Sequence, residues 1–401
     1  MSRSGQDEKP ESPALWQFVP LADYARPESP AAHAAVTAWA RIKQVFKQDP
    51  THNDSPAKRE EDLRRLPQLR LQNLARPIDW RALAKELGDS LAERWLEEGP
   101  RVSFLIGQPH CEHAQIANQW AELQQATLIE PPSMEQILSN DQSWHRTWAS
   151  GDKPWVLPRL ERCFLRHANG LDLVRHFLEA AASGRAGKGL IACDSWAWAF
   201  LRRVWPLPQP FALTLQAFDG QALARLFSLL GAPKGKRRVS FRNARSGQET
   251  LSVPYQGDGC SEELIRLAAH CRGNPGTARD YWRERLRSTP DADVDLDQDE
   301  GESANGEVIW VSAALAQPTL PNDAAEDVAL LLHALLLHGG LTEPALAEVL
   351  PLSRQRSMAT LCRLQQLEVA EWSNGEWRVA ALAYALVRDW LRGRDFLTDD
   401  F

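Results

Sequence analysis

Short apolar runs alternate with helical patterns between residues 101 and 216. The runs are VSFLI, ATLIE, WVLP, GLIAC and FALTLQ, at 102–106, 126–130, 155–158, 189–193 and 211–216. Apolar residues recur with helical spacing between the runs, near 113–124, 133–149 and 170–184. Strands that alternate with helices form βαβ units on a parallel sheet. The pattern therefore predicts an α/β domain, which we expect over 99–230.

A helical region is predicted ahead of this domain, over residues 1–98. The segment ARPIDWRALAKELGDSLAERWLEEGP, at 75–100, enters a helix through Asp79 and places Trp80, Leu83 and Leu87 on one face. Before it, helical stretches such as AAHAAVTAWARIKQVF are broken by the polar segment QDPTHNDSPAKREED. The first residues, MSRSGQDEKPESP, are polar and are expected to be disordered.

The middle of the chain changes character twice. Residues 261–288 read as two helices that meet at a Gly-Asn-Pro-Gly turn, so we expect a helical lid over 231–290. The segment DADVDLDQDEGESANGE is acidic and poor in apolar residues, which predicts a flexible linker over 291–322.

The last block, 323–401, carries the pattern of a winged helix. The helix DVALLLHALLLH ends at two glycines, Thr342 caps TEPALAEVL, and Ser353 caps SRQRSMATLCRLQQL. Two short strands then flank Asn374-Gly375, a strong signal for a β-hairpin. The helix ALAYALVRDWLRG closes the block.

Composition narrows the class of protein. The 401 residues are 43% hydrophobic and 25% charged, with a net charge of -7, which gives no general sign of a nucleic-acid binder. The six cysteines form no CxxC pair, as in a protein with reduced thiols. The longest apolar stretch, 328–337, is about half of the roughly 20 residues that a membrane helix needs. These features predict a cytoplasmic protein without membrane insertion.

The order of these parts resembles the AAA+/STAND group of P-loop ATPases, and bacterial AAA-type ATPases in particular. The segments that carry the resemblance are WVLPRLERCFLRHANGLDLVRHFLE, GLIACDSWAWAFL and RGNPGTARDYW. The resemblance extends over roughly 100–395 and implies a P-loop NTPase-like parallel sheet with a helical lid and a C-terminal winged helix. It also implies assembly with other subunits.

The residues that would handle ATP in this family have been replaced. The motif G-x-x-x-x-G-K-[ST] reads GQPHCEHA here, so Gly107 is followed by Glu112, His113 and Ala114 in place of Gly, Lys and Ser/Thr. A neutral histidine lacks the lysine's charge, and an alanine has no oxygen for magnesium. Arg159 stands where an acidic residue should end the third strand. Catalytic residues, ATP and magnesium are therefore not expected.

Two polar residues survive at the remaining family positions. The resemblance places Asp194 at the end of the fourth strand as a sensor and Arg279 in the lid. The segment HCEH, at 110–113, also has residue types suited to a zinc half-site. Cys111 or Cys193 with Asp194 has residue types suited to a nucleophile. The zinc reading lacks a second Cys/His cluster, and the nucleophile reading rests on residue types alone.

Two basic groups offer a contact for nucleic acid or for an acidic partner. Their residues are Lys234, Lys236, Arg237, Arg238, Arg354 and Arg356. Taken together, the sequence predicts a non-catalytic AAA+/STAND-like scaffold or regulatory adaptor that binds a partner protein, such as an active ATPase. The alternatives are a winged-helix DNA-binding regulator and a switch that binds nucleotide without hydrolysing it.

Overall fold

Six strands form the main sheet, in the order β1-β7-β3-β6-β5-β4. Their bounds are Phe18–Pro20 (β1), Val102–Gly107 (β3), Thr127–Leu128 (β4), Trp155–Leu157 (β5), Gly189–Asp194 (β6) and Phe211–Leu215 (β7). Five strands run parallel, and β1 pairs antiparallel with β7 at one edge. The five strands predicted from the apolar runs are confirmed, and the fold is α/β with a P-loop NTPase-like parallel sheet.

This computed structural model describes most of the chain. The described ranges are 14–27, 58–96, 101–146, 153–183, 186–206, 210–232, 239–251, 260–290, 307–312, 318–321 and 326–401. Within them, no helix combines the length and the apolar character that crossing a membrane requires. The predicted helix AAHAAVTAWARIKQVF lies outside these ranges.

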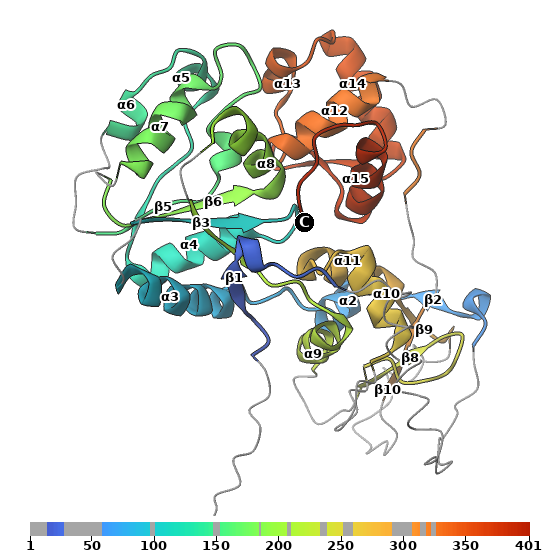
Figure 1. The fold of residues 1–401 in the computed structure, drawn as a ribbon. Coiled ribbons are helices and arrows are strands. Elements are labelled where there is room, and N and C mark those ends of the chain that lie inside the picture. The colour runs from blue at the N-terminus through green and yellow to red at the C-terminus, as the bar shows by residue number, and fades with distance from the viewer. Residues whose placement is uncertain are drawn as a thin grey trace, which may run out of the picture.

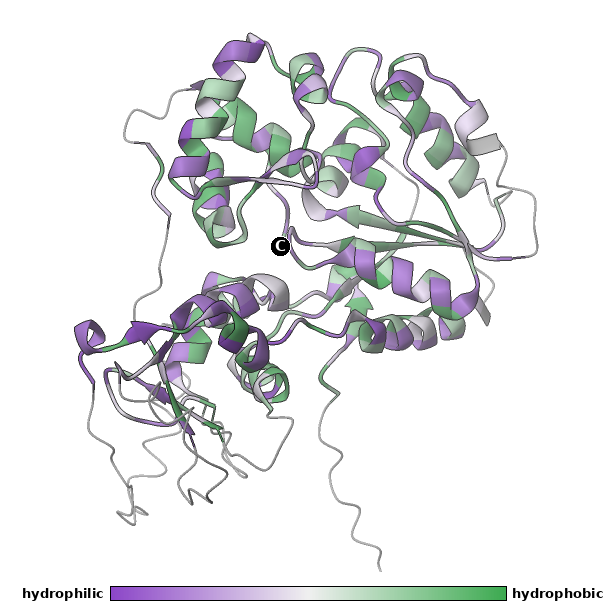
Figure 2. Ribbon diagram, turned by 180° about the vertical axis from the view of Figure 1, so that it is seen from behind, coloured by the Kyte–Doolittle hydropathy of each residue, from purple (hydrophilic) through white to green (hydrophobic). Residues whose placement is uncertain are grey.

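Helices cover both faces of the sheet (Figure 1). Helices α3 (Trp80–Leu96) and α4 (His113–Gln124) lie on one face, and α7 (Asp172–Ala182) and α8 (Ser195–Val204) lie on the other. Because side chains alternate along a strand, Leu105 packs into the core on the α3 side while Phe104 and Ile106 pack on the α8 side. Figure 2 shows hydrophobic residues on the strands and on the helix faces turned toward them. Two short helices, α5 (Met134–Leu138) and α6 (Ser143–Arg146), follow β4.

A second body lies beneath the main sheet (Figure 1). It contains α2 (Gln68–Leu74), α9 (Gly220–Gly231), α10 (Glu262–His270) and α11 (Pro275–Arg285). It also holds a four-stranded sheet, β2-β9-β10-β8, with bounds Arg64–Arg65, Leu286–Ser288, Glu307–Val311 and Val239–Asn243. The rings of Phe227 on α9 and Trp282 on α11 stack at 4.6 Å, so α9 belongs to this body.

These findings correct several expected boundaries. Strand β10 lies within 291–322, which we expected to be only a linker, and it pairs in parallel with β8. The lid over 231–290 contains strands as well as helices. The N-terminal region contributes the strand β1 in addition to the helices α2 and α3. Neither β8 nor β10 could be predicted locally, because each is completed by a partner far away in the sequence.

The C-terminal block is a winged helix, as predicted. Its elements are α12 (Glu326–Leu337), α13 (Glu343–Val349), α14 (Arg354–Gln366), β11 (Ala370–Ser373), β12 (Glu376–Val379) and α15 (Tyr384–Arg392). The side chains of Thr342 and Ser353 accept backbone hydrogen bonds as N-caps. Asn374 and Gly375 have φ values of 54° and 82°, as a tight hairpin turn requires.

Candidate functional site

The carboxyl ends of β3, β5 and β6 meet at one edge of the sheet, where ligands bind in open α/β folds. Gly107 and Asp194 are paired across β3 and β6, so the loop after β3 faces the end of β6. The P-loop position of the sequence therefore lies at the expected edge. The side chains gathered there decide what this edge can bind.

The loop 107–113 is closed on itself. His110 and Glu112 adopt left-handed backbone conformations, with φ values of 64° and 57°. A Cβ on Gly107 would lie 2.4 Å from Cys111 Sγ and 2.7 Å from His113 Cβ. The space above Gly107, where a phosphate-binding loop needs room for phosphate oxygens, is thus filled by the side chains of the loop.

His113 is turned inward from the start of α4. Its Nε2 lies 3.4 Å from Glu161 Oε1, and its Nδ1 lies 4.0 Å from Cys111 Sγ. Glu161 lies in a short 3-10 helix, η3 (Leu160–Arg162), after β5, and its other oxygen accepts the Asp194 N–H at 3.1 Å. Asp194 Oδ1 accepts the Trp196 N–H at 2.9 Å and so caps α8. One buried network therefore joins the ends of β3, β5 and β6.

The charges in this network depend on one another. Burial opposes the charged form of His113, but the Glu161 carboxylate raises the pKa of His113 well above its ordinary value. Burial also opposes the charged form of Glu161 and so raises its pKa, but His113 outweighs this and lowers the pKa of that carboxyl. Burial raises the pKa of Asp194 well above its usual range. Both shifts favour the ionised form of the His113–Glu161 pair.

Little room remains around this network. The cavity beside it has a volume of about 90 Å³, and its lining includes Glu112, His113, Ala114, Arg159 and Asp194. Small-molecule sites occupy roughly 300–1,000 Å³. The structure therefore brings together five of the predicted remnant residues around a space that is too small for a nucleotide.

The winged helix covers this cavity. Leu335, Leu336 and Gly339, at the end of α12, and Arg378 and Val379, from β12, complete its lining. A Cβ on Gly339 would lie 3.2 Å from Glu161 Cγ, so the turn after α12 approaches the network closely.

An ion pair and a backbone contact hold this arrangement. Arg162 donates to both carboxylate oxygens of Glu376, at 2.7 and 2.6 Å, and to the Gly339 carbonyl at 3.0 Å. The charge-assisted bidentate pair fixes the angle between η3 and the hairpin.

The last residues of the chain reinforce the contact. Asp399 accepts hydrogen bonds from Ser195 Oγ at 2.7 Å, Tyr384 Oη at 3.1 Å and Arg388 Nε at 2.8 Å. Its side chain is fully buried. Because Ser195 directly follows Asp194, the C-terminal segment is tied to the same edge of the sheet.

The lid meets the loop through Asn274, while Arg279 lies elsewhere. Asn274 Nδ2 donates to the Pro109 carbonyl at 2.7 Å. Arg279 donates to the carbonyls of Arg76 and Ala75 and pairs with Asp280 at 3.0 Å. The expectation that Arg279 faces the nucleotide position is therefore corrected: it holds the segment between α2 and α3.

The structure gives little support to a zinc site or a cysteine nucleophile at HCEH. In the described part of the chain, no three His, Cys, Asp or Glu side chains are grouped as metal ligands would be. Cys193 is fully buried in β6, and burial raises its pKa. Cys111 lies near His113, but His113 is committed to Glu161.

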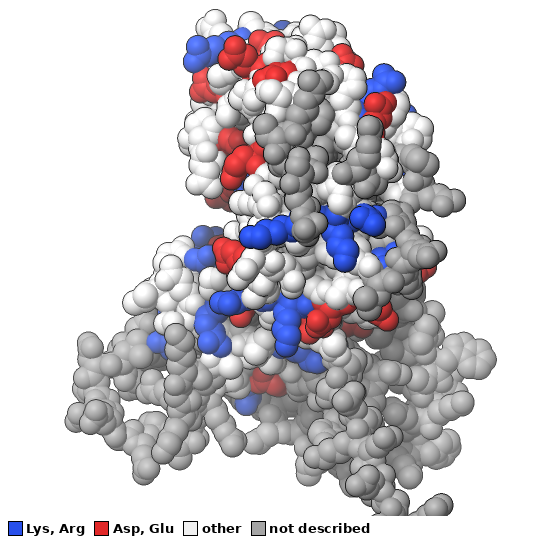
Figure 3. All heavy atoms as spheres, turned by 90° about the vertical axis from the view of Figure 1, so that its left-hand side faces the viewer, with Lys and Arg blue, Asp and Glu red and all other residues white. Residues whose placement is uncertain are grey.

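Of the six basic residues predicted to contact nucleic acid or an acidic partner, the structure describes two. Arg354 pairs with Glu343 at 2.8 Å, and Arg356 pairs with Asp327. Lys234, Lys236, Arg237 and Arg238 lie outside the described residues. On the face seen in Figure 3, basic and acidic side chains are intermingled.

Sequence reasoning missed the residues that complete this site. Glu161, Asn274 and Asp399 each lie close to a predicted element, but no periodic pattern marks them. A signal existed for Glu161, an acidic residue within four positions of a buried strand. Asn274 belongs to the Gly-Asn-Pro-Gly turn, which predicts the meeting of two helices but neither the N-cap of α11 nor the contact with the loop.

Comparisons with known proteins add a remote likeness. No protein-family model and no curated protein matches the sequence. Among solved structures, a chain from "Structure of Drosophila ORC bound to DNA" is 14% identical, with a TM-score of 0.37. The likeness covers 88% of this chain and 99% of that chain. Independently of this likeness, the order and direction of its own strands define this chain as an α/β protein with a mainly parallel six-stranded sheet.

Proposed function

We propose that the protein is a non-catalytic AAA+/STAND-like scaffold or regulatory adaptor that binds a partner protein. The observation that carries this proposal is the ion pair between His113 and Glu161, 3.4 Å apart. The residue in the position of the phosphate-binding lysine is committed to a carboxylate of the protein. A nucleotide would have to displace that pair and the turn at Gly339.

The described residues at this edge of the sheet give no support to hydrolysis. Ala114 offers no oxygen for a metal, and Glu161 is used by His113 and by the Asp194 N–H. Phosphoryl transfer needs a cation and a metal to neutralise charge on the phosphates. The cavity of about 90 Å³ also argues against a nucleotide that is bound without being hydrolysed.

The position of the winged helix supports a role in protein contacts. The end of α12 and the β11–β12 hairpin face the α/β core. The ion pair between Arg162 of the core and Glu376 of the winged helix joins the two domains. A module packed in this way contributes to a fixed scaffold. Its outer surface remains for a partner in a multi-subunit assembly.

Nucleotide binding is the direct test. The full chain is heated with and without magnesium-ATP or magnesium-ADP, and turnover is measured in the same buffer. A ligand at 100 times its Kd would stabilise the fold by about 2.7 kcal/mol. We expect neither a shift in Tm nor turnover. Turnover that disappears in Asp194→Asn would refute the proposal.

DNA binding through α14 is the second candidate. This helix has three arginines and no acidic residue, and Arg354 and Arg356 are exposed, so their surface ion pairs are weak. A salt-dependent mobility shift with duplex DNA that weakens in the double variant Arg354→Gln, Arg356→Gln would favour it. The absence of a shift at low salt would eliminate it.

A further inference from the structure

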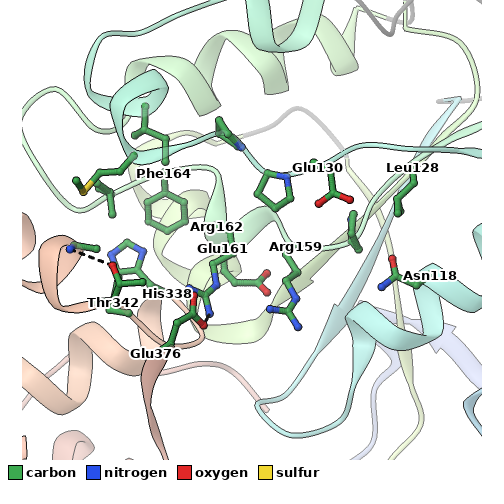
Figure 4. A pocket seen from close by; sticks show the side chains of 18 residues that line it. Asn118, Leu128, Glu130, Arg159, Glu161, Arg162, Phe164, His338, Thr342 and Glu376 are labelled. Carbon is green, nitrogen blue, oxygen red and sulfur yellow. Dashed lines mark hydrogen bonds and ion pairs between the residues drawn. The ribbon is translucent and has the colours of Figure 1, made fainter. Parts of the chain in front are cut away.

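A larger cleft lies beside the closed site, between the edge of the main sheet and the winged helix. It has a volume of about 530 Å³, within the range of ligand-binding sites. Figure 4 shows Phe164, His338 and Thr342 on one side and Asn118, Leu128 and Glu130 on the other, with Arg159 between them. This cleft and the small cavity of about 90 Å³ are two distinct spaces, and Arg159 lines both.

Several charged side chains of the cleft already have partners. Arg162 is paired with Glu376, and Glu161 is paired with His113. Arg159 differs from them, because its half-buried guanidinium has no hydrogen bond or ion pair with the described residues. A guanidinium that is partly withdrawn from water favours an anionic partner with which it can form charge-assisted hydrogen bonds.

A second polar atom of the cleft also lacks a partner. Asn118 Oδ1, on α4, is buried and accepts no hydrogen bond in the described structure. A buried acceptor left unpaired costs about 1–3 kcal/mol. Because Asn118 lines the cleft, rotation of its amide toward an N–H of a ligand would remove that cost. The cleft thus offers a cation and an acceptor to one occupant.

Apolar side chains lie at the mouth of the cleft. Leu128 is 45% exposed and Met134 is 36% exposed, and both line the cleft. Leu128 belongs to β4, the edge strand of the sheet. Apolar surface beside a polar pocket is typical of protein interaction sites.

We propose that this cleft binds a short segment of the partner protein in which an acidic side chain is flanked by apolar ones. The acidic side chain pairs with Arg159, an N–H of the segment reaches Asn118 Oδ1, and apolar side chains cover Leu128 and Met134. This inference rests on the proposed function as a protein-binding adaptor, and it names the surface and the chemistry of the partner.

Charge favours a peptide segment over a nucleic acid. Three carboxylates, from Glu130, Glu161 and Glu376, line the same cleft as Arg159. Glu161 and Glu376 are paired with His113 and Arg162, so Arg159 is the cation of the cleft that remains for a ligand. A nucleic-acid strand carries a negative charge at every phosphate and needs several such cations along its path. A segment with one acidic side chain can reach Arg159 and present neutral atoms elsewhere.

Fluorescence anisotropy with labelled peptide pools tests the proposal on the full chain. Each pool contains decapeptides with leucine or phenylalanine on both sides of a central aspartate, asparagine or lysine. We expect the aspartate pool to bind at least tenfold more tightly than the other two pools. Arg159→Gln should abolish this preference, and Arg159→Lys should retain part of it, because lysine keeps the charge and loses the bidentate geometry.

Two further variants separate charge from packing and from unfolding. Arg245→Gln, an exposed arginine after β8, should leave the preference unchanged. Leu128→Ser should weaken binding of the aspartate pool at least fivefold without changing its preference over asparagine. Each variant is used only after its Tm has been compared with that of the wild type, and Arg159→Lys serves in place of Arg159→Gln if the latter is unfolded.

The remaining outcomes are decisive as well. Equal binding of the three pools, or a preference that survives Arg159→Gln, overturns the inference. Binding of a fluorescent ten-nucleotide oligothymidine that depends on Arg159 would overturn it in favour of nucleic acid. The anisotropy measurements are repeated with magnesium-ATP in the same samples. A change in peptide binding caused by the nucleotide would contradict the proposed function. The inference about the cleft is decided separately, by the preference for the aspartate pool.

Discussion

His113 Nε2 lies 3.4 Å from Glu161 Oε1, and this contact joins the loop after β3 to the 3-10 helix after β5. Both side chains are almost completely buried, at 10% and 5% exposure. The pair lies at the edge of the sheet where the carboxyl ends of β3 and β5 meet. Its energetics therefore decide whether the edge of the sheet stays closed.

Removing one charge of this pair should destabilise the protein strongly. Glu161→Gln leaves His113 buried beside a neutral amide, and breaking a buried ion pair costs about 3–5 kcal/mol. Urea unfolding followed by circular dichroism measures the loss. Glu179→Gln is the matched control, because Glu179 forms a surface pair with Arg175 and should cost at most about 1 kcal/mol. Equal losses of unfolding free energy in the two variants would show that the buried pair stabilises the protein no more than the surface pair does.

The stabilisation from this pair should depend on pH. The folded-state pKa of His113 is raised, so its contribution is complete below about pH 6.5 and is lost as the pH rises through the folded value. The pKa of Glu161 is lowered, so its contribution is present above about pH 4.5 and is lost as the pH falls.

The difference in unfolding free energy between the wild type and the double variant His113→Gln, Glu161→Gln should therefore be largest between about pH 4.5 and 6.5. Measurements at pH 6 and at pH 9 test this directly. An equal difference at pH 6 and at pH 9 would contradict the expectation that His113 and Glu161 form an ion pair in the folded protein.

An alanine at Gly107 should disrupt the closed loop. Its Cβ would lie 2.4 Å from Cys111 Sγ, so the loop would have to move, at a cost of about 1–3 kcal/mol. Gly393→Ala is the matched control, because its nearest neighbour would be 3.5 Å away and its φ is negative. Thermal unfolding should separate the two variants by several degrees. A neutral Gly107→Ala would mean that the loop has room to open.

Asp399→Asn should loosen the winged helix from the core. Arg388 is only 3% exposed, so loss of its carboxylate partner should cost about 3 kcal/mol. Limited proteolysis should then cleave the chain faster between the second body and α12. Asp400→Asn, one residue further on, is exposed and should leave the digestion rate unchanged. Identical digestion of both variants would refute the role of Asp399 as a tie.

Elements whose partners are local could be predicted from the sequence. The strands β3 and β6 are buried on both faces, so they appear as continuous apolar runs. The caps at Thr342 and Ser353 and the turn at Asn374 depend on residues within three positions. The sheet and the winged helix were therefore accessible to pattern analysis.

Contacts between distant segments could not be predicted. The strand β10 has only five residues and follows an acidic stretch, and its pairing of Glu307 with Val239 depends on a segment far earlier in the chain. Glu161 follows β5 by four residues, and it is the short turn of η3 that directs its side chain inward. The segment around Asp399, FLTDDF, is too short to show a periodicity that would indicate burial.

The beginning and the end of the described chain meet at this same edge. The rings of Tyr24 and Phe401 lie 4.7 Å apart, and Arg26 donates to the carbonyl of Asp400, 374 positions away. Loop-closure entropy grows slowly with length, but for residues so far apart no local contact offsets it in advance. During synthesis this contact cannot form until Asp400 and Phe401 have left the exit tunnel, so this edge of the sheet closes only after the segments before them have been made.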